Sequence, residues 1–339
     1  MLLLASLGAL LALSGALACS ADQTPAKGEL MVAVSTDMSP GVKRDFDKLG
    51  VDIYRSGQAL KNFVFDEVGN EGLLTLPATL AIVGNDDPKT TILLRVWTEL
   101  KVDIGGEQKD EARTLVEVST TIPADRIALL RVPMQWLCLG SGEIKGNYVE
   151  GVCDEGTSCI GGKCLDWNVD SSTLPTYDPK LVFGGGSAEG DGTCFDTLAC
   201  FASDLGGYVV PMSEIDTGTC SIASPGGGGP INVALVTERG QGGICYGAID
   251  RCLVPLDESK VAGWHEDNGR IVLPPGVCTP EKFFSGKMLE IAVTTGCATK
   301  TEQLPTCGPW STVDKPDGTF DAAPPTGLGD GGGGAGGGM

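Results

Sequence analysis

The sequence predicts an all-β protein that is cross-linked by disulfide bonds. Short segments of strand length recur along the chain between clusters of Gly, Pro, Asn and Asp, which is the pattern of strands joined by turns. The 339 residues include 50 Gly and 20 Pro with an aromatic content of 6%, and this composition favours turns and strands over long helices. The chain also has 13 Cys, a number that predicts a disulfide framework in an exported protein.

Residues 1–18 form an apolar leader that predicts export from the cytoplasm. The leader has no charged side chain, and it is too short and too rich in Gly, Ser and Ala for a transmembrane span. Ala16-Leu17-Ala18 satisfies the small-x-small rule of secretory cleavage sites, and Cys19 follows directly. We therefore expect 1–18 to be a signal peptide, Cys19 to be a lipid-attachment point and 19–27 to be a polar tether. The alternative is an ordinary cleaved signal that leaves Cys19 unmodified.

Residues 28–138 contain seven segments with the length and patterning of β-strands. Some are continuous apolar runs, others alternate apolar with polar residues, and turn signals separate them. Seven short strands without a sizeable amphipathic helix predict an antiparallel β-sandwich of immunoglobulin-like or transthyretin-like type. The predicted strands are 30–36, 51–54, 63–65, 79–83, 91–97, 115–120 and 128–134.

A small disulfide-rich connector is predicted at 139–167. Cys138, Cys153, Cys159 and Cys164 fall close together, as in small extracellular modules where disulfides replace a hydrophobic core. Zinc binding is a poor alternative, because the chain has no Cys-x2-Cys pair and its one histidine lies far away in the sequence. We expect these four cysteines to form disulfides, and the spacing does not choose between the pairings.

A second disulfide-stapled β domain is predicted at 194–311. Turn signals at 168–193 predict a linker before it, in which 181–183 is a candidate edge strand. After it, 312–339 loses apolar content and predicts a disordered Gly/Pro-rich tail. The expected strands of this domain are 208–210, 231–237, 270–273 and 288–294. The cysteines expected to form its disulfides are Cys194, Cys200, Cys220, Cys245, Cys252, Cys278, Cys297 and Cys307. Sequence alone leaves their pairing open, with Cys194–Cys200 and Cys245–Cys252 as short-range candidates.

The chain is strongly acidic, with a formal net charge of −20 at pH 7 and an isoelectric point near 4.3. Such a surface repels the phosphate backbone of nucleic acids, so the sequence excludes nucleic-acid binding. Without Cys19 the chain has twelve cysteines, an even number that permits complete pairing.

No stretch of the sequence carries a recognisable catalytic motif. His265 is the only histidine, so any Ser-His-Asp or Cys-His nucleophile system has to use it, and no Gly-x-Ser-x-Gly motif supplies a serine. Trp264 lies beside it in a polar stretch and is the best candidate for a sugar-stacking platform. We expect Trp264 and His265 to form part of an exposed ligand-binding loop, and we expect no catalytic residue, no metal site and no cofactor.

The order of these parts resembles that of uncharacterised bacterial cell-envelope lipoproteins: leader, Cys19, polar tether, β-sandwich, cysteine-dense connector, β domain and glycine-rich tail. The resemblance implies an exported protein that a lipid on Cys19 anchors at the outer membrane, facing the periplasm or the cell surface. A soluble periplasmic or secreted protein is the alternative. The resemblance and the lack of catalytic motifs together favour a non-enzymatic protein that binds a protein or glycan partner or contributes to envelope structure. Two other functions stay open: a secreted hydrolase that uses acidic residues, and a disulfide-rich inhibitor or accessory subunit of a secreted enzyme.

Overall fold

In the computed structural model, the residues described are 28–41, 44–69, 74–85, 87–202, 207–226, 228–245 and 251–314. The predicted signal peptide, Cys19 and the tether lie outside these ranges, as does the tail beyond Asp314. This part of the chain consists mostly of β-strands with two short α-helices, and its cysteines form six disulfides. The predicted all-β, disulfide-rich fold is confirmed. Within these ranges, no helix has the length and apolar character needed to cross a bilayer.

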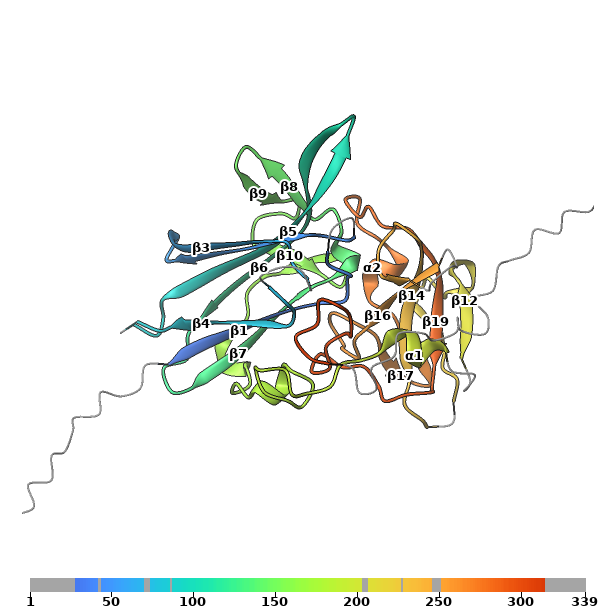
Figure 1. Ribbon diagram of the computed structural model, residues 1–339. Helices are drawn as coiled ribbons and strands as arrows, with labels where there is room; N and C mark the ends of the chain where they lie inside the picture. Colours follow the sequence, from blue (N-terminus) through green and yellow to red (C-terminus); the bar gives the residue numbers. More distant parts are fainter. Residues whose placement is uncertain are drawn as a thin grey trace, which may run out of the picture.

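Each of the seven segments predicted as strands in the N-terminal half is a strand. They are β1 (Glu29–Thr36), β2 (Lys48–Arg55), β3 (Gln58–Asp66), β4 (Ala78–Val83), β5 (Thr91–Ile104), β6 (Glu107–Thr121) and β7 (Ile127–Met134). They form two facing sheets, with the strand orders β3-β2-β5-β6 and β4-β1-β7 (Figure 1). The pairing is antiparallel except between β1 and β7, which run parallel. Parallel neighbours need a long crossover connection, and here the strands from β2 to β6 provide it.

Alternation along the strands places one face of each sheet in a shared core. On β1, the side chains of Leu30, Val32 and Val34 are buried, and they face Leu94 and Val96 of the opposite sheet within the same cluster. β6 lies against β7 at one side of this sandwich. At the other side, β3 and β4 are the outer strands of their sheets, and each has a single strand neighbour. The sandwich is therefore closed along one side and open along the other.

Two small hairpins make up the connector, and both lie against β6. The connector contains η1 (Trp136–Cys138), β8 (Gly142–Lys145), β9 (Tyr148–Gly151), β10 (Thr157–Ile160) and β11 (Lys163–Asp166). Its four cysteines pair among themselves as Cys138–Cys159 and Cys153–Cys164. The two disulfides interleave along the chain, so together they brace both hairpins.

The segment 168–193 packs along the N-terminal sandwich. Val169 N donates to Ser119 O (2.9 Å) and Tyr177 N donates to Ile127 O (2.8 Å), so the segment follows β6 and then β7. It contains η2 (Ser171–Thr173) and η3 (Pro179–Leu181). The prediction of an edge strand at 181–183 is wrong, because the chain turns there in η3 and buries the side chain of Phe183 against the Cys194–Cys307 disulfide.

The C-terminal half is built on a five-stranded antiparallel sheet with the order β12-β19-β14-β16-β15. Its strands are β12 (Tyr208–Pro211), β14 (Asn232–Glu238), β15 (Ile244–Cys245), β16 (Arg251–Leu256) and β19 (Met288–Thr294). A three-stranded sheet contains β13 (Ser221–Ala223), β17 (His265–Asp267) and β18 (Arg270–Val272), and the helical segments are α1 (Thr197–Ala202), η4 (Met212–Glu214) and α2 (Pro275–Cys278). One face of the five-stranded sheet packs on α1 through residues such as Val236 and Leu253, and the other faces the N-terminal half.

The four disulfides of the C-terminal half are nested one inside another. Cys194–Cys307 encloses Cys200–Cys297, which encloses Cys220–Cys278, which in turn encloses Cys245–Cys252. Of the two short-range candidates, Cys245–Cys252 forms, across the β15–β16 pair. Cys194–Cys200 does not form, because α1 directs these two cysteines to different partner segments.

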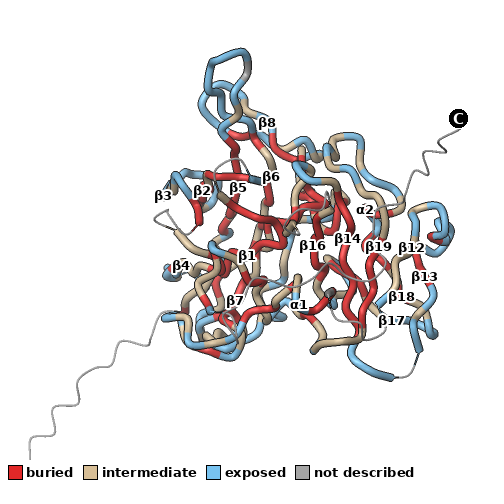
Figure 2. Tube along the Cα trace, turned by 45° about the vertical axis from the view of Figure 1, so that its right-hand side comes forward, coloured by how far each residue is buried: buried red, intermediate tan, exposed pale blue. Residues whose placement is uncertain are grey.

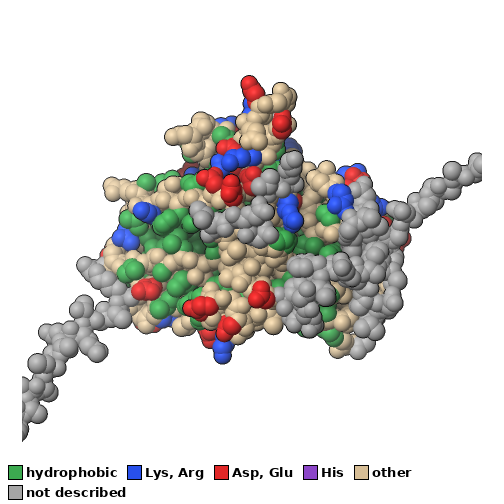
Figure 3. Space-filling view, viewed as in Figure 1, with side chains coloured by type: hydrophobic (Ala, Val, Ile, Leu, Met, Phe, Trp, Pro, Cys, Tyr) green, Lys and Arg blue, Asp and Glu red, His purple; other side chains and the backbone are tan. Residues whose placement is uncertain are grey.

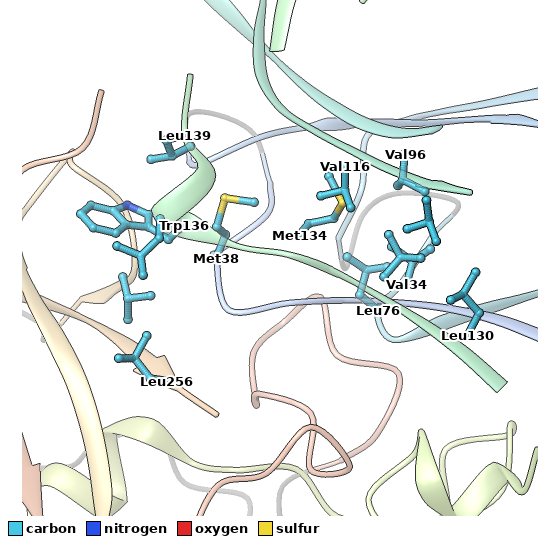
Figure 4. Packing of buried hydrophobic residues seen from close by; sticks show 14 of the residues in the cluster. Val34, Met38, Leu76, Val96, Val116, Leu130, Met134, Trp136, Leu139 and Leu256 are labelled. Atoms are coloured by element: carbon cyan, nitrogen blue, oxygen red, sulfur yellow. The ribbon is translucent and has the colours of Figure 1, made fainter. Parts of the chain in front are cut away.

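The two halves share one continuous hydrophobic core. A single cluster of buried side chains runs from Leu30 in β1 to Ile291 in β19, and Figure 2 shows buried residues along the strands of both halves. Trp136, which is fully buried, lies at the junction. Figure 4 shows its ring on the side of Leu256, away from the side chains inside the first sandwich. The halves are consequently joined by packing as well as by the chain.

Candidate functional site

Trp264 is a core residue. The prediction that it lies in an exposed loop is wrong, since the residue is only 2% exposed and belongs to the shared core. The physical reason is local pairing: Trp264 N donates to Asp257 O (3.0 Å), and Ser259 N donates to Trp264 O (2.8 Å). These two hydrogen bonds fold the polar segment back on itself, and the indole of Trp264 then lies in the core. The ring is therefore not accessible as a platform for a sugar.

His265 follows at the start of β17, opposite Val272 of β18. Its side chain is partly buried, and Nδ1 has no hydrogen-bond partner. Within the described part of the chain, no Ser, Asp or Glu side chain forms a hydrogen bond with it, and the cysteines are disulfide-bonded. The arrangement of a nucleophile, a base and an orienting acid is not assembled around His265.

A small polar cavity lies where the two halves meet. Its lining includes the polar side chains of Asp37, Gln135, Asp257, Lys300, Glu302 and Thr306. The cavity has a volume of about 20 Å³, which is room for about one water molecule. A sugar ring or a cofactor is far larger than this space, so the cavity is not a subsite for such ligands.

Asp37 is the most perturbed acid of this cavity. Its Oδ1 accepts a hydrogen bond from Trp136 N (2.7 Å), and the residue is 8% exposed. Burial raises the pKa of Asp37 from 3.8 to about 7, and the hydrogen bond from Trp136 and the charge of Lys300 only partly oppose this effect. Asp37 therefore holds a proton near neutral pH far more readily than an exposed aspartate does.

Asp257 and Lys300 also line the cavity and form a charged pair. Lys300 Nζ donates to Asp257 Oδ1, and the lysine side chain is almost fully buried. Thr306 lines the same cavity, and its Oγ1 is buried without a hydrogen-bond partner. Asp37 comes from the N-terminal half and the other three come from the C-terminal half, so the cavity exists only because the halves are docked.

A second candidate site is the open side of the N-terminal sandwich, between β3 and β4. Phe63 and Phe65 of β3 are partly exposed, pack on the core and lie stacked with their ring centroids 6.5 Å apart. Ala78 and Leu80 of β4 approach the same core from the other sheet and are also partly exposed. Figure 3 shows hydrophobic side chains gathered on this face of the molecule. We call these two strands and their apolar side chains the open edge.

The two strands of the open edge differ in how they are protected against pairing with another chain. β3 carries Lys61, whose Nζ lies 5.5 Å from the Phe63 ring centroid, and its register with β2 shifts between Ile53 and Tyr54. Lysines and such irregularities are devices that keep edge strands from adding further strands. β4 reads Ala-Thr-Leu-Ala-Ile-Val, with no charge and no proline, and its register with β1 is regular. β4 thus carries no such device of its own, and the charged group at this edge is Arg55 of β2, whose Nη2 donates to Val83 O (3.1 Å) at the end of the strand.

The comparisons with known proteins add no homologue: no family model, no curated protein and no solved structure matches this chain. Among the described residues, no group of three or more His, Cys, Asp and Glu side chains is placed to hold a metal ion.

Sequence reasoning missed both candidate sites. The strand at 79–83 was visible as an apolar run, but its place at the edge of a sheet depends on which strands pair with β1. Asp37, Asp257 and Lys300 are distant in sequence, and nothing local marks any of them.

Proposed function

We propose that this chain is an exported, envelope-anchored protein that works without catalysis by binding an extended segment of a partner protein at β4. The observation that carries the proposal is the edge of β4, which has a regular register and no charge or proline of its own. Its backbone has a strand neighbour on one side only, and Val83 is 49% exposed. An uncharged, apolar edge strand is a template for another strand.

The open edge also supplies specificity for such a segment. A strand that pairs with β4 places alternate side chains toward the core side of the sandwich, where Phe63 and Phe65 are partly exposed. These rings and Leu80 favour apolar side chains at alternate positions. Lys61 beside Phe63 favours an acidic side chain next to them. The partner segment is therefore an alternating apolar strand with an acidic residue.

A protein partner is favoured over a glycan by the same surface. The tryptophan that could have stacked on a sugar is in the core, and the open edge presents backbone groups and apolar side chains. Six disulfides support an oxidising compartment outside the cytoplasm. Anchoring through a lipid on Cys19 is part of the proposal and rests on the leader sequence.

Site-specific photo-crosslinking in intact cells tests the binding site. A benzophenone amino acid is placed at Val83 on β4 and, as a matched control, at Val261 in the C-terminal half, which is 58% exposed. We expect one dominant crosslinked product of defined mass from position 83 and none from position 261. The substitution Ala81→Lys, which adds a charge to β4, abolishes the product, whereas Val261→Lys leaves it in place.

Other outcomes decide between the remaining interpretations. A product with twice the mass of the chain identifies a second copy as the occupant of β4. A product that contains a secreted enzyme identifies an inhibitor or accessory subunit. Equal products from both positions, or none from position 83, would overturn the proposed binding site.

A further inference from the structure

Lys300 and Asp257 are neighbours in register on two paired segments. Glu258 N donates to Lys300 O (2.9 Å), and Glu258 and Thr301 form a parallel bridge. This backbone pairing sets residue 257 beside residue 300, with their side chains in direct contact through Nζ and Oδ1. The backbone pairing thus holds the amine of Lys300 against the carboxyl group of Asp257.

The lysine is buried to a degree that is unusual for its residue type. Lys300 is 4% exposed, and within the described residues Asp257 is the only hydrogen-bond acceptor of its Nζ. An ammonium group has three donors and is strongly stabilised by water, so a buried lysine with one acceptor is costly. An amide at this position carries no charge and needs far less solvation.

A second acidic group, Asp37, completes the site. Asp37 lines the same cavity, and Oδ1 already accepts the Trp136 N–H, so the proton of the neutral acid is carried by Oδ2. Burial raises the pKa of Asp37 to about 7, which allows its carboxyl group both to give and to take a proton near neutral pH. Thr306 lines the same cavity and adds a buried hydroxyl that has no hydrogen-bond partner among the described residues.

We propose that Lys300 and Asp257 become joined by an intramolecular isopeptide bond. A proton passes from Lys300 Nζ to the Asp257 carboxylate, and the neutral amine attacks Cγ of the resulting acid. The Nζ–Cγ bond forms while Asp37 donates a proton to the carboxyl oxygen. One Cγ–O bond then breaks, Asp37 takes back a proton from the nitrogen, and one water molecule leaves. The step is a condensation, so no electrons are gained or lost and no co-reactant is required.

The surroundings favour this reaction in two ways. The fold holds the amine against the carboxyl group, so the two groups react without first having to meet by diffusion. Well-oriented intramolecular reactions of this kind reach effective molarities of roughly 10⁵ M or more. The cavity of about 20 Å³ beside the pair has room for about one water molecule, which is the product that leaves. The Thr306 hydroxyl is available to hydrogen-bond the carbonyl oxygen of the new amide.

Mass spectrometry of the purified, full-length protein tests the proposal without a ligand or a partner, so its outcome is independent of the proposed binding site. We expect the reduced and denatured chain to be lighter than its sequence predicts by the mass of one water molecule. Peptide mapping then locates the bond. After alkylation and trypsin digestion, peptide 252–260, which contains Asp257, is expected to be joined to a C-terminal peptide that begins at Met288 and is not cleaved at Lys300.

Three variants separate the roles of the residues. Lys300→Arg keeps the positive charge but has no amine to react, and it is expected to have the full sequence mass. Asp257→Asn is expected to reach the same final mass as the cross-linked wild type, because it loses ammonia where the acid loses water. Asp37→Asn is expected to leave most of the chain unlinked, with circular dichroism verifying that it is folded. A wild-type chain with the full sequence mass and a free tryptic cleavage at Lys300 would overturn the proposal.

Discussion

Asp45 and Gly243 lie 198 residues apart in the chain, and the Asp45 carboxylate accepts a hydrogen bond from Gly243 N at 3.1 Å. The same oxygen, Oδ2, accepts Ser39 N at 2.7 Å, and Asp45 is 4% exposed. Next to it, Trp136 Nε1 donates to Gln241 O at 2.7 Å. The N-terminal sandwich therefore holds the 241–243 turn of the C-terminal half through one buried carboxylate and one indole.

Replacing this carboxylate tests how much the junction contributes to stability. Asp45→Ala leaves two buried N–H groups without an acceptor and is expected to lower the free energy of unfolding by about 3 kcal/mol. Asp45→Asn can keep both hydrogen bonds, because both fall on one oxygen, so its loss is expected to be smaller than that of Asp45→Ala. Urea unfolding followed by tryptophan fluorescence measures both. Equal stability of Asp45→Ala and the wild type would show that the junction depends on apolar packing alone.

The stability of the protein is expected to fall as the pH rises from about 4 to about 7. The pKa of Asp37 is raised by burial from 3.8 to about 7, so in this range the folded chain keeps a proton that the unfolded chain releases. The stabilisation is complete below the unfolded pKa, is lost as the pH rises to the folded pKa, and amounts to about 4 kcal/mol. The pKa values of Asp45 and Asp47 are also raised by burial, and they act in the same direction.

The Asp37→Asn variant isolates this effect, because an amide does not titrate. The difference in unfolding free energy between wild type and variant is expected to shrink as the pH rises from about 4 to about 7. Both proteins also carry Lys300→Arg, so that neither forms the isopeptide bond and the charges beside residue 37 are the same in both. Parallel curves across this range would contradict the assignment of a raised pKa to Asp37.

The nested disulfides are expected to contribute unequally to stability. Cys194–Cys307 closes a loop of 113 residues, whereas Cys245–Cys252 closes one of 7. Because Cys200–Cys297 stays intact and already joins the two ends, the outer bond effectively closes only the 6 residues from 194 to 200 and the 10 residues from 297 to 307. On the chain-entropy account, replacing both cysteines of the outer pair by serine lowers the free energy of unfolding by about 3 kcal/mol, and the inner pair by about 2 kcal/mol. Urea unfolding of the two double variants gives the order. The reverse order would mean that packing around the sulfur atoms outweighs loop closure.

The charge added to β4 is expected to leave the fold intact. Ala81 is exposed on the outer face of the strand, so Ala81→Lys is expected to change the unfolding free energy by less than about 0.5 kcal/mol. Leu80→Ala on the inner face serves as the contrasting variant and is expected to be clearly destabilised. If Ala81→Lys unfolds as easily as Leu80→Ala, its effect on crosslinking says nothing about binding.

The N-terminal strands were predictable because their patterning is local. Segments such as 115–120 alternate apolar with polar residues, or are continuously apolar, within the length of one strand. β16 was not predicted, since Pro255 interrupts its apolar run and prolines are rare inside sheets. The structure explains the exception. Pro255 pairs with Ala234 of β14 on one side, and β15 is too short to reach it on the other.

Trp264 and the polar cavity were not predictable for a different reason. Four of the residues around Trp264 are polar, which is typical of an exposed turn, and only its pairing with Asp257 shows that the ring points inward. The cavity joins Asp37 to Lys300, and their proximity depends on how the two halves dock. Contacts of this kind leave no periodic signal in a single sequence.

The proposed function requires a protein that is exported, oxidised and held at the envelope. The most direct test is the intact mass of the native protein from a membrane fraction, with free thiols alkylated before any reduction. We expect a chain that begins at Cys19, carries a lipid, and has no alkylated thiol because its twelve remaining cysteines form six disulfides. A chain that retains residues 1–18, or one with several alkylated thiols, would contradict this expectation.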